Sequence, residues 1–217
     1  MPNWCNQHLT VQGDKEALRR FVADAAQEDI EGNKSIGLNH FVPCPQALVD
    51  TMEGSYGDQD KQNELIEKQN ENKINYGFAT WYDWANVVWG TKWGACDVQV
   101  NSRIKSVSYG DQKQGEIEIS FQSAWSPASG LIAGISMLYP TLIFAMWFDE
   151  ESNAFAGWQI FKNGVIVAEH DYKVKPPTDE EYPDEDDWRD AYEVWQDEFT
   201  GQLAITLKQA IRSVHML

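Results

Sequence analysis

Apolar and polar positions at the start of the chain predict a strand followed by a helix. Residues 4–11 alternate loosely toward Gly13, as in a half-buried strand that ends in a turn. Asp14 is placed to cap the next helix, because its carboxylate can accept from unpaired backbone N–H groups of the first turn. The apolar positions of this helix repeat on one face: Leu18, Phe21, Val22 and Ala25. Residues 33–41 are expected to form a second strand, which the prolines of residues 43–45 end.

The middle of the chain contains two contrasting segments. Residues 51–75 are rich in Asp, Gln, Asn, Glu and Lys, and this composition predicts an exposed insertion with one short helix. Residues 81–93 carry four tryptophans. The first apolar positions of this segment have the spacing of one helix face, and Gly90 can adopt the left-handed conformation of a residue that ends a helix. We therefore expect a polar helix and then an aromatic one.

The second half of the chain adds strands and one further helix. Strands are expected at residues 96–100, 104–109, 116–121, 141–148, 154–161 and 165–171. The strand of residues 116–121 alternates strictly, which is typical of a half-buried antiparallel strand. Ser126 as the cap and Pro127 at the first helical position predict a helix that ends before Pro140. Residues 162–164 are typical of a hairpin turn, here between the strands of residues 154–161 and 165–171.

The predicted order of elements is β-α-β-β-α-β. This is the order of the ferredoxin-like sandwich, an α+β fold with an antiparallel sheet, here with a helical insertion, an extra β-hairpin and a C-terminal acidic helix. We divide the chain into a ferredoxin-like domain at residues 1–175, with the insertion at about residues 46–94, and an acidic aromatic extension at residues 176–217 that packs on it.

Charge is concentrated in that extension. The chain of 217 residues has a formal net charge of −17. Residues 176–198 contain eleven acidic residues and one basic residue, and so carry −10 of that charge. Apolar positions recur there at helical spacing: Trp188, Tyr192, Trp195, Phe199, Leu203, Leu207, Ile211 and Val214. The pattern predicts an acidic helix with an apolar face, interrupted or bent near Gly201.

Composition excludes several function classes. An acidic chain with a pI near 4.5 is the reverse of the basic footprint of nucleic-acid binding, so direct nucleic-acid binding is not expected. Apolar runs are too short to span a bilayer, and no secretion signal is evident. Three widely spaced cysteines indicate neither a disulfide framework nor a zinc knuckle. We expect a cytoplasmic protein with no membrane contact.

Catalytic candidates are few. The four histidines are scattered, without a spacing that places two metal ligands on one helical face, so we expect no metal and no cofactor. Cys5 and His8 would point to opposite faces of a strand, which favours a buried structural cysteine over a nucleophile. We interpret residues 149–151, three consecutive acids, as solvated loop charge in preference to paired catalytic carboxylates. The sequence predicts no catalytic residue.

Two features remain as candidate sites. The first is a ligand groove formed by Trp89, Lys92 and Trp93, in which Lys92 either lies over an aromatic ring or faces a ligand; Trp81 and Trp84 are interpreted as core residues. The second is an acidic face made of Asp179, Glu180, Glu181, Asp184, Glu185, Asp186, Asp187, Asp190, Glu193, Asp197 and Glu198. That face either keeps the protein soluble or imitates the phosphates of nucleic acid and attracts basic clefts.

Three short motifs resemble the YubB-type family, which has a ferredoxin-like domain. They are residues 2–6, residues 89–93, and residues 124–127 with the helix that follows. The resemblance covers residues 2 to about 172 and leaves the acidic tail outside. The chain departs from the family at Cys44, where a Pro-Met-Pro type of turn is usual, and at Val88, where the family favours Asn. The resemblance implies a protein of phages, prophages or plasmids whose biochemical role is largely undefined.

These observations lead to two hypotheses of function. The first is a non-enzymatic cytoplasmic interaction module of a phage or mobile element, whose partner is a host or phage protein with a basic surface. Its sharper form is a counter-defence inhibitor that occupies a nucleic-acid site as an acidic mimic. The alternative is an enzyme or a nucleotide-binding protein with a pocket between the sheet and residues 81–93.

Overall fold

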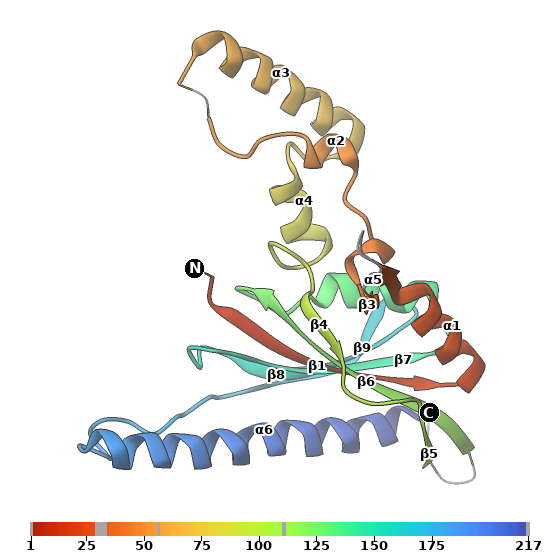
Figure 1. The fold of residues 1–217 in the computed structure, drawn as a ribbon, viewed down its shortest axis with the longest axis vertical. Coiled ribbons are helices and arrows are strands. Elements are labelled where there is room, and N and C mark those ends of the chain that lie inside the picture. Colours follow the sequence, from red (N-terminus) through yellow and green to blue (C-terminus); the bar gives the residue numbers. More distant parts are fainter. Residues whose placement is uncertain (1, 29–33, 56, 110–111, 216–217) are drawn as a thin grey trace.

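A seven-stranded antiparallel sheet forms the centre of the protein (Figure 1). The computed structural model describes residues 2–28, 34–55, 57–109 and 112–215. The strands of the sheet are β1 (Trp4–Gly13), β4 (Cys96–Val100), β5 (Lys105–Tyr109), β6 (Gln112–Ala124), β7 (Ile143–Glu150), β8 (Ala156–Lys162) and β9 (Val165–Tyr172). Their order is β4-β6-β1-β7-β8-β9, with β5 paired to β6. The run β4-β6-β1-β7 is the strand order of the ferredoxin-like fold, which confirms the predicted fold class.

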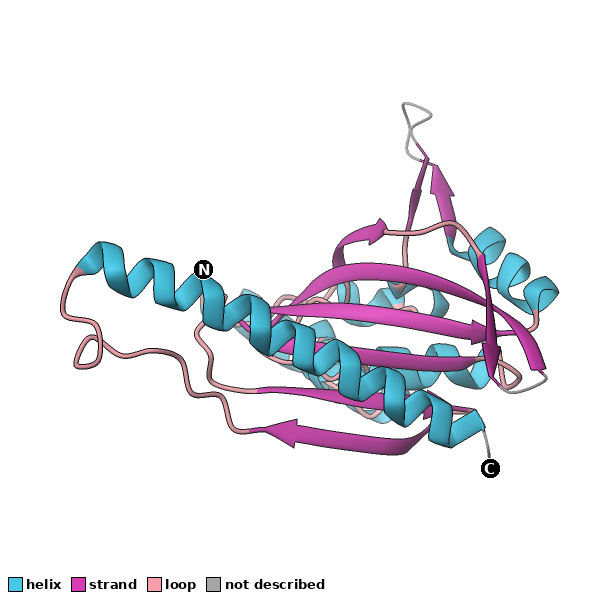
Figure 2. Cartoon of the chain, turned by 90° about the horizontal axis from the view of Figure 1, so that it is seen from below, coloured by secondary structure: helices cyan, strands magenta, loops and turns pink. Residues whose placement is uncertain are grey.

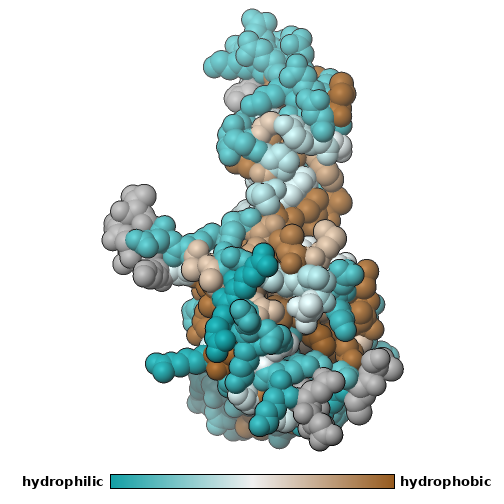
Figure 3. Space-filling view, turned by 90° about the vertical axis from the view of Figure 1, so that its right-hand side faces the viewer, coloured by the Kyte–Doolittle hydropathy of each residue, from teal (hydrophilic) through white to brown (hydrophobic). Residues whose placement is uncertain are grey.

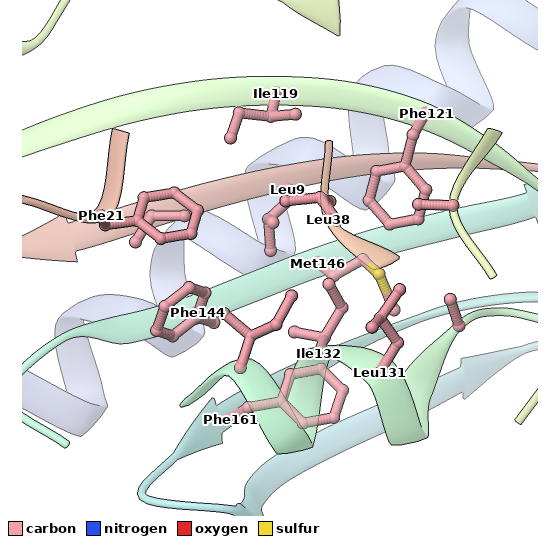
Figure 4. Packing of buried hydrophobic residues seen from close by; sticks show 14 of the residues in the cluster. Leu9, Phe21, Leu38, Ile119, Phe121, Leu131, Ile132, Phe144, Met146 and Phe161 are labelled. Carbon is pink, nitrogen blue, oxygen red and sulfur yellow. The ribbon is translucent and has the colours of Figure 1, made fainter. Parts of the chain in front are cut away.

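Two helices cover one face of this sheet and enclose the main core. They are α1 (Lys15–Ala25) and α5 (Ser129–Leu138). Because successive strand residues point to opposite faces, alternate positions of β1, β6 and β7 supply the apolar floor, and Leu9, Ile119 and Phe144 are completely or almost completely buried there. Phe21 of α1 and Ile132 of α5 pack onto this floor (Figure 4).

The two helices begin in different ways. Asp14 caps α1 as predicted, since its carboxylate accepts hydrogen bonds from the backbone N–H groups of Glu16 and Ala17. The predicted cap of α5 is wrong. The Ser126 hydroxyl donates instead to the carbonyl of Gly90, 2.6 Å away, and α5 begins after Ala128 without a side-chain cap. Ser126 therefore links α5 to the loop that precedes β4.

One long helix, α6 (Glu185–His215), covers part of the opposite face (Figures 1 and 2). Leu203, Leu207 and Ile211 of α6 are buried, and Leu207 and Ile211 pack in one cluster with apolar positions of β7 and β8. The predicted interruption near Gly201 is wrong, because α6 continues through this residue. A glycine inside a helix costs only about 1 kcal/mol, which the packing on both sides of it outweighs.

The insertion forms a helical tower that leads away from the sheet (Figure 1). After a 3-10 turn (Asn39–Phe41), it contains α2 (Gln46–Val49), α3 (Gln59–Tyr76) and α4 (Trp81–Val88). At 18 residues α3 is longer than the short helix expected. Its surface is mainly hydrophilic (Figure 3), yet the buried Asn72 donates hydrogen bonds to the Thr51 hydroxyl and the Ala79 carbonyl. A polar anchor thus holds a helix that has few apolar residues.

The second strand of the ferredoxin-like unit is not the segment predicted. Within residues 33–41, residue 33 lies outside the described residues, Lys34–Ile36 form the short strand β3, and residues 39–41 form the 3-10 turn. β3 pairs only with β2 (Ala26–Glu28), in a separate two-stranded ribbon. The apolar residues of this segment cover the core from a loop, and β4 takes the sheet position beside β6.

Two local predictions from turn chemistry are confirmed. Asn163 and Gly164 have positive φ angles of 50° and 83°, as a two-residue hairpin turn between β8 and β9 requires. The aromatic helix is α4, and Gly90 follows it with a φ of 81°.

Candidate binding groove between the sheet and the C-terminal helix

All eleven acidic residues predicted as an interaction face are exposed. Four precede α6 and seven lie in its first half. Between them, four aromatic side chains of α6 stack on one another in a half-buried ladder, with successive ring centroids 5.1, 5.5 and 5.2 Å apart: Trp188, Tyr192, Trp195 and Phe199. The ladder meets the sheet at Tyr172, whose ring lies edge-on to Phe199. Seven of the eleven carboxylates therefore project from a helix that is tied to the domain.

Two of the three residues predicted to form a groove, Trp89 and Lys92, contact other parts of the protein, while Trp93 is 38% exposed. The indole N–H of Trp89 donates to the Val42 carbonyl, 2.8 Å away. The Lys92 ammonium lies 4.7 Å from the ring centroid of Trp93 and 5.7 Å from that of Tyr82. Of the two alternatives for Lys92, the structure has the one over an aromatic ring. Trp84 is buried, as expected for a core residue, and Trp81 is partly buried in the same cluster.

A cavity of about 910 Å³ lies elsewhere, between α6 and the sheet. Gln196, Asp197 and Thr200 of α6 line one side of it, and residues of β1, β4, β6 and β7 line the other. It lies beside the part of α6 that precedes the buried residues Leu203, Leu207 and Ile211. Before these residues, α6 runs over strand positions that are polar, and we call this cavity the α6 groove.

The first polar row of the groove floor crosses three strands in register. Gln122 of β6, Asn6 of β1 and Asp149 of β7 are direct neighbours in the sheet. Gln122 Nε2 donates to Asn6 Oδ1 at 3.0 Å, and Asn6 Nδ2 donates to Asp149 Oδ2 at 3.3 Å. Burial raises the pKa of Asp149, and the nearby charge of Glu150 adds to this effect while the Asn6 hydrogen bond opposes it. The row thus ends in a carboxylate that is costly to ionise.

The second row places an aromatic pair beside the first. His8 of β1 and Trp147 of β7 are direct neighbours, and their rings stack with centroids 3.9 Å apart and planes 8° apart. Burial lowers the pKa of His8, although the charge of Glu118 opposes the shift. The lowered pKa favours the neutral imidazole, and because the two rings stack, each covers one face of the other and only their outer faces remain for a ligand.

Three carboxyl groups line the α6 groove. They belong to Asp97, Asp149 and Asp197, and no lysine or arginine of the described residues lines this cavity. Asp97 lies at an irregularity in the pairing of β4 with β6 and has a φ of 50°. Such bulges re-aim side chains at the edge of a sheet. The groove is suited to neutral or cationic groups and repels phosphate.

The interpretation of residues 149–151 as solvated loop charge is wrong for two of the three. Strand β7 extends to Glu150, whose side chain is only 2% exposed and accepts hydrogen bonds from the backbone N–H groups of Ser152 and Ala154. Asp149 is half-buried in the α6 groove, and only Glu151 is exposed. The strand pattern of residues 141–148 predicted an extended backbone close to Asp149, but it did not indicate that α6 lies opposite Asp149.

The buried cysteine was interpreted correctly. Cys5 lies in the main core while His8 lines the α6 groove, on opposite faces of β1. Burial, together with the charges of Asp149 and Glu150, raises the pKa of the Cys5 thiol far above its usual range. Among the described residues no group of three His, Cys, Asp or Glu side chains is placed to hold a metal ion. No helix of the described residues has the length and apolar character needed to cross a membrane.

Comparison with known proteins supports the fold. Residues 106–194 match a family model described as the ferredoxin-like domain in Api92-like protein. No curated protein matches. One similar solved structure, a crystal structure of a protein api92 from Yersinia pseudotuberculosis, is 11% identical, with 82% of this chain and all of that chain covered and a TM-score of 0.47.

The family match differs in extent from the resemblance to YubB-type proteins. It begins inside β5 and ends within α6, so it includes most of the acidic segment that the resemblance left outside. Residues 106–194 are thus similar to the ferredoxin-like domain of Api92-like proteins, and the strand order of the sheet is that of the same fold.

Proposed function

We propose that the protein is a non-enzymatic interaction module that binds a partner with a basic surface through residues 179–198. The observation that carries this proposal is the exposure of all eleven acidic side chains of this segment. Only Arg189 offsets them, in an ion pair with Asp186. A concentrated negative surface raises the rate at which a basic partner associates and orients its approach.

The rigidity of the segment favours specific binding over mere solubility. A solubilising tail needs no fixed structure, whereas seven of these eleven carboxylates lie on a helix, and three contacts tie that helix to other parts of the chain. The Trp188 indole donates to the Pro177 carbonyl at 3.2 Å, Asn153 donates to the Tyr192 hydroxyl at 2.8 Å, and Phe199 packs on Tyr172. A preorganised charge pattern loses less entropy on binding than a disordered one.

The finer form of the proposal concerns the partner. Carboxylates at fixed spacing on a helix can occupy a cleft that normally holds phosphates. With the resemblance to YubB-type proteins of phages and plasmids, this supports a cytoplasmic counter-defence inhibitor that blocks the nucleic-acid site of a host protein. The alternative of a nucleotide pocket beside residues 81–93 gains no support from Lys92, whose ammonium lies over aromatic rings.

The experiment compares two charge variants of the whole protein. The test variant changes four exposed acids of α6 to amides: Asp187, Asp190, Glu193 and Glu198. The control variant makes the same change in net charge on α3, at four exposed acids: Asp60, Glu64, Glu67 and Glu71. Both variants and the unchanged protein are used to capture partners from lysate at low and high salt, and each captured partner is then tested for nucleic-acid binding in competition.

The expected result is capture of a protein with a basic cleft, which the α6 variant loses and the α3 variant keeps. Capture should weaken as salt rises, because salt screens interactions between exposed charges. Added nucleic acid should displace the inhibitor if it occupies a nucleic-acid site. Equal capture by all three proteins, or capture that salt does not affect, would contradict the proposal.

A further inference from the structure

We propose that the α6 groove binds an arginine side chain of the partner, with the guanidinium stacked on the His8–Trp147 pair and hydrogen-bonded to Asp149. This inference rests on the proposed function, since it names the chemistry by which a basic partner is recognised. It assigns that recognition to the groove, which shares only Asp197 with the exposed acids of residues 179–198; the other acids supply attraction at longer range.

The size and position of the groove suit an inserted side chain. Ligand pockets in proteins are typically about 300–1,000 Å³, and this cavity of about 910 Å³ is within that range. It can take a guanidinium together with the flanking peptide. A smaller cavity of about 110 Å³ adjoins it and shares His8 and Trp147, so the aromatic pair is accessible from both.

The charges of the lining select a cation. Three aspartates and no lysine or arginine of the described residues line the α6 groove, while Lys208 lines the smaller adjoining cavity. Asp149 and Asp97 come from strands at either side of β1 and β6, while Asp197 comes from α6 on the opposite wall. Because the site is partly removed from water, these charges act more strongly on a bound cation than exposed carboxylates would. An anionic ligand would be repelled from every side.

The shape and hydrogen bonds of the lining select arginine among cations. Guanidinium is planar, stacks on aromatic faces and offers a fork of donors to a carboxylate, whereas the lysine ammonium is a compact, strongly hydrated point charge. An outer ring face of the stacked His8–Trp147 pair supplies the flat face, because the two rings cover each other's inner faces. Asp149 uses only Oδ2 to accept from Asn6, and Oδ1 accepts no hydrogen bond from the described residues. One carboxylate oxygen thus remains for a donor from outside.

A permanently charged cation in the groove would also stabilise the ionised form of Asp149. Burial makes the ionised form of Asp149 unfavourable. Arginine stays charged at every accessible pH, and a nearby positive charge stabilises a carboxylate. Binding would therefore recover free energy that the free protein loses at this position.

The test uses short capped peptides and the full chain. The probe is a tripeptide with a central arginine, and its matched controls have citrulline, which keeps the shape without the charge, or lysine. Binding is followed by NMR of the His8 imidazole and Trp147 indole and by calorimetry. Three variants are compared: Asp149→Asn in the groove, Glu151→Gln, which removes an exposed carboxylate just beyond it, and the four-acid α6 variant described above.

The expected result is that the arginine peptide shifts the resonances of His8 and Trp147. Asp149→Asn should weaken its affinity by about tenfold or more, because it removes the partner of a partly buried charge pair, while Glu151→Gln should change little. Citrulline should not bind, and lysine should bind more weakly than arginine. Equal binding of citrulline, or an unchanged affinity in Asp149→Asn, would overturn the inference.

The same variants separate this inference from the proposed function. If the arginine peptide does not reach the groove while capture of a basic partner still depends on the α6 acids, the groove inference fails and the proposed function stands. If the peptide binds the groove in the four-acid variant as in the unchanged protein, the groove acts independently of the exposed charge and the inference is supported. If the peptide binds but no partner depends on residues 179–198, the proposed function fails instead.

Discussion

Replacing Leu207 with alanine tests whether α6 is an integral part of the fold. The Leu207 side chain is 2% exposed and packs in a cluster with Ile143, Ala145, Ile160 and Ile211. Leucine loses three carbon groups in this change, and at about 0.8 kcal/mol for each the lost transfer free energy is about 2.4 kcal/mol. The cavity left behind adds to it, and leucine-to-alanine changes in cores span about 2–5 kcal/mol. Alanine's better helix propensity recovers only a few tenths of that.

The control is Ile205→Ala, two residues earlier on the same helix. Its side chain is 59% exposed, so truncation there should change the unfolding free energy by no more than about 0.5 kcal/mol. Urea unfolding of both variants, followed by tryptophan fluorescence, measures the difference. If Leu207→Ala is no more destabilised than Ile205→Ala, then α6 is not packed on the sheet, and both the groove and the fixed acidic surface lose their structural basis.

Three further predictions concern two glycines and one carboxylate. Gly130→Ala should lower the unfolding free energy by about 1–3 kcal/mol, because the added Cβ would overlap the Val88 carbonyl oxygen; thermal melting measures it. Gly201→Ala makes the same chemical change in open space on α6 and should raise stability by about 1 kcal/mol, so a fall would contradict an uninterrupted helix. Asp149→Asn should stabilise the protein at pH 7. The pKa of Asp149 is raised on folding, so its ionisation costs stability as the pH rises through the folded pKa. Urea unfolding below pH 3.8 should therefore show the stability advantage of Asp149→Asn disappear. A stability difference between the two proteins that does not depend on pH would contradict a buried carboxylate.

Strands that pair along their whole length were the most predictable part of the fold. Residues 116–121 alternate strictly because one face of β6 packs on α1 and α5 while the other is polar, and this periodicity is visible without knowledge of the partners. Residues 33–41 had no such constraint. Leu38 is buried and Phe41 packs on the core from a loop and a 3-10 turn, and a few apolar residues at irregular spacing do not distinguish this from a strand.

The α6 groove was not predictable in the same way. The polar positions of β1, such as Asn6 and His8, do alternate with buried ones, but a polar strand face is equally consistent with open solvent. What turns this face into a groove is a helix about 190 residues further along the chain. The spacing of apolar residues from Trp188 to Val214 predicted one continuous apolar stripe along the helix. The structure divides it: the aromatic half stacks mostly on itself and meets the sheet at Tyr172, whereas Leu203, Leu207 and Ile211 are buried.

This division explains how one helix can carry both proposed binding surfaces. Burial of Leu203, Leu207 and Ile211 fixes the C-terminal half of α6, and the uninterrupted backbone transmits that position to the N-terminal half, which has few contacts with the sheet of its own. Asp197 belongs to both surfaces, since it is one of the eleven exposed acids and also lines the groove. Loss of the anchor in Leu207→Ala should therefore weaken peptide binding in the groove and partner capture together. Neutralising Asp187, Asp190, Glu193 and Glu198 leaves the anchor intact and should weaken partner capture alone.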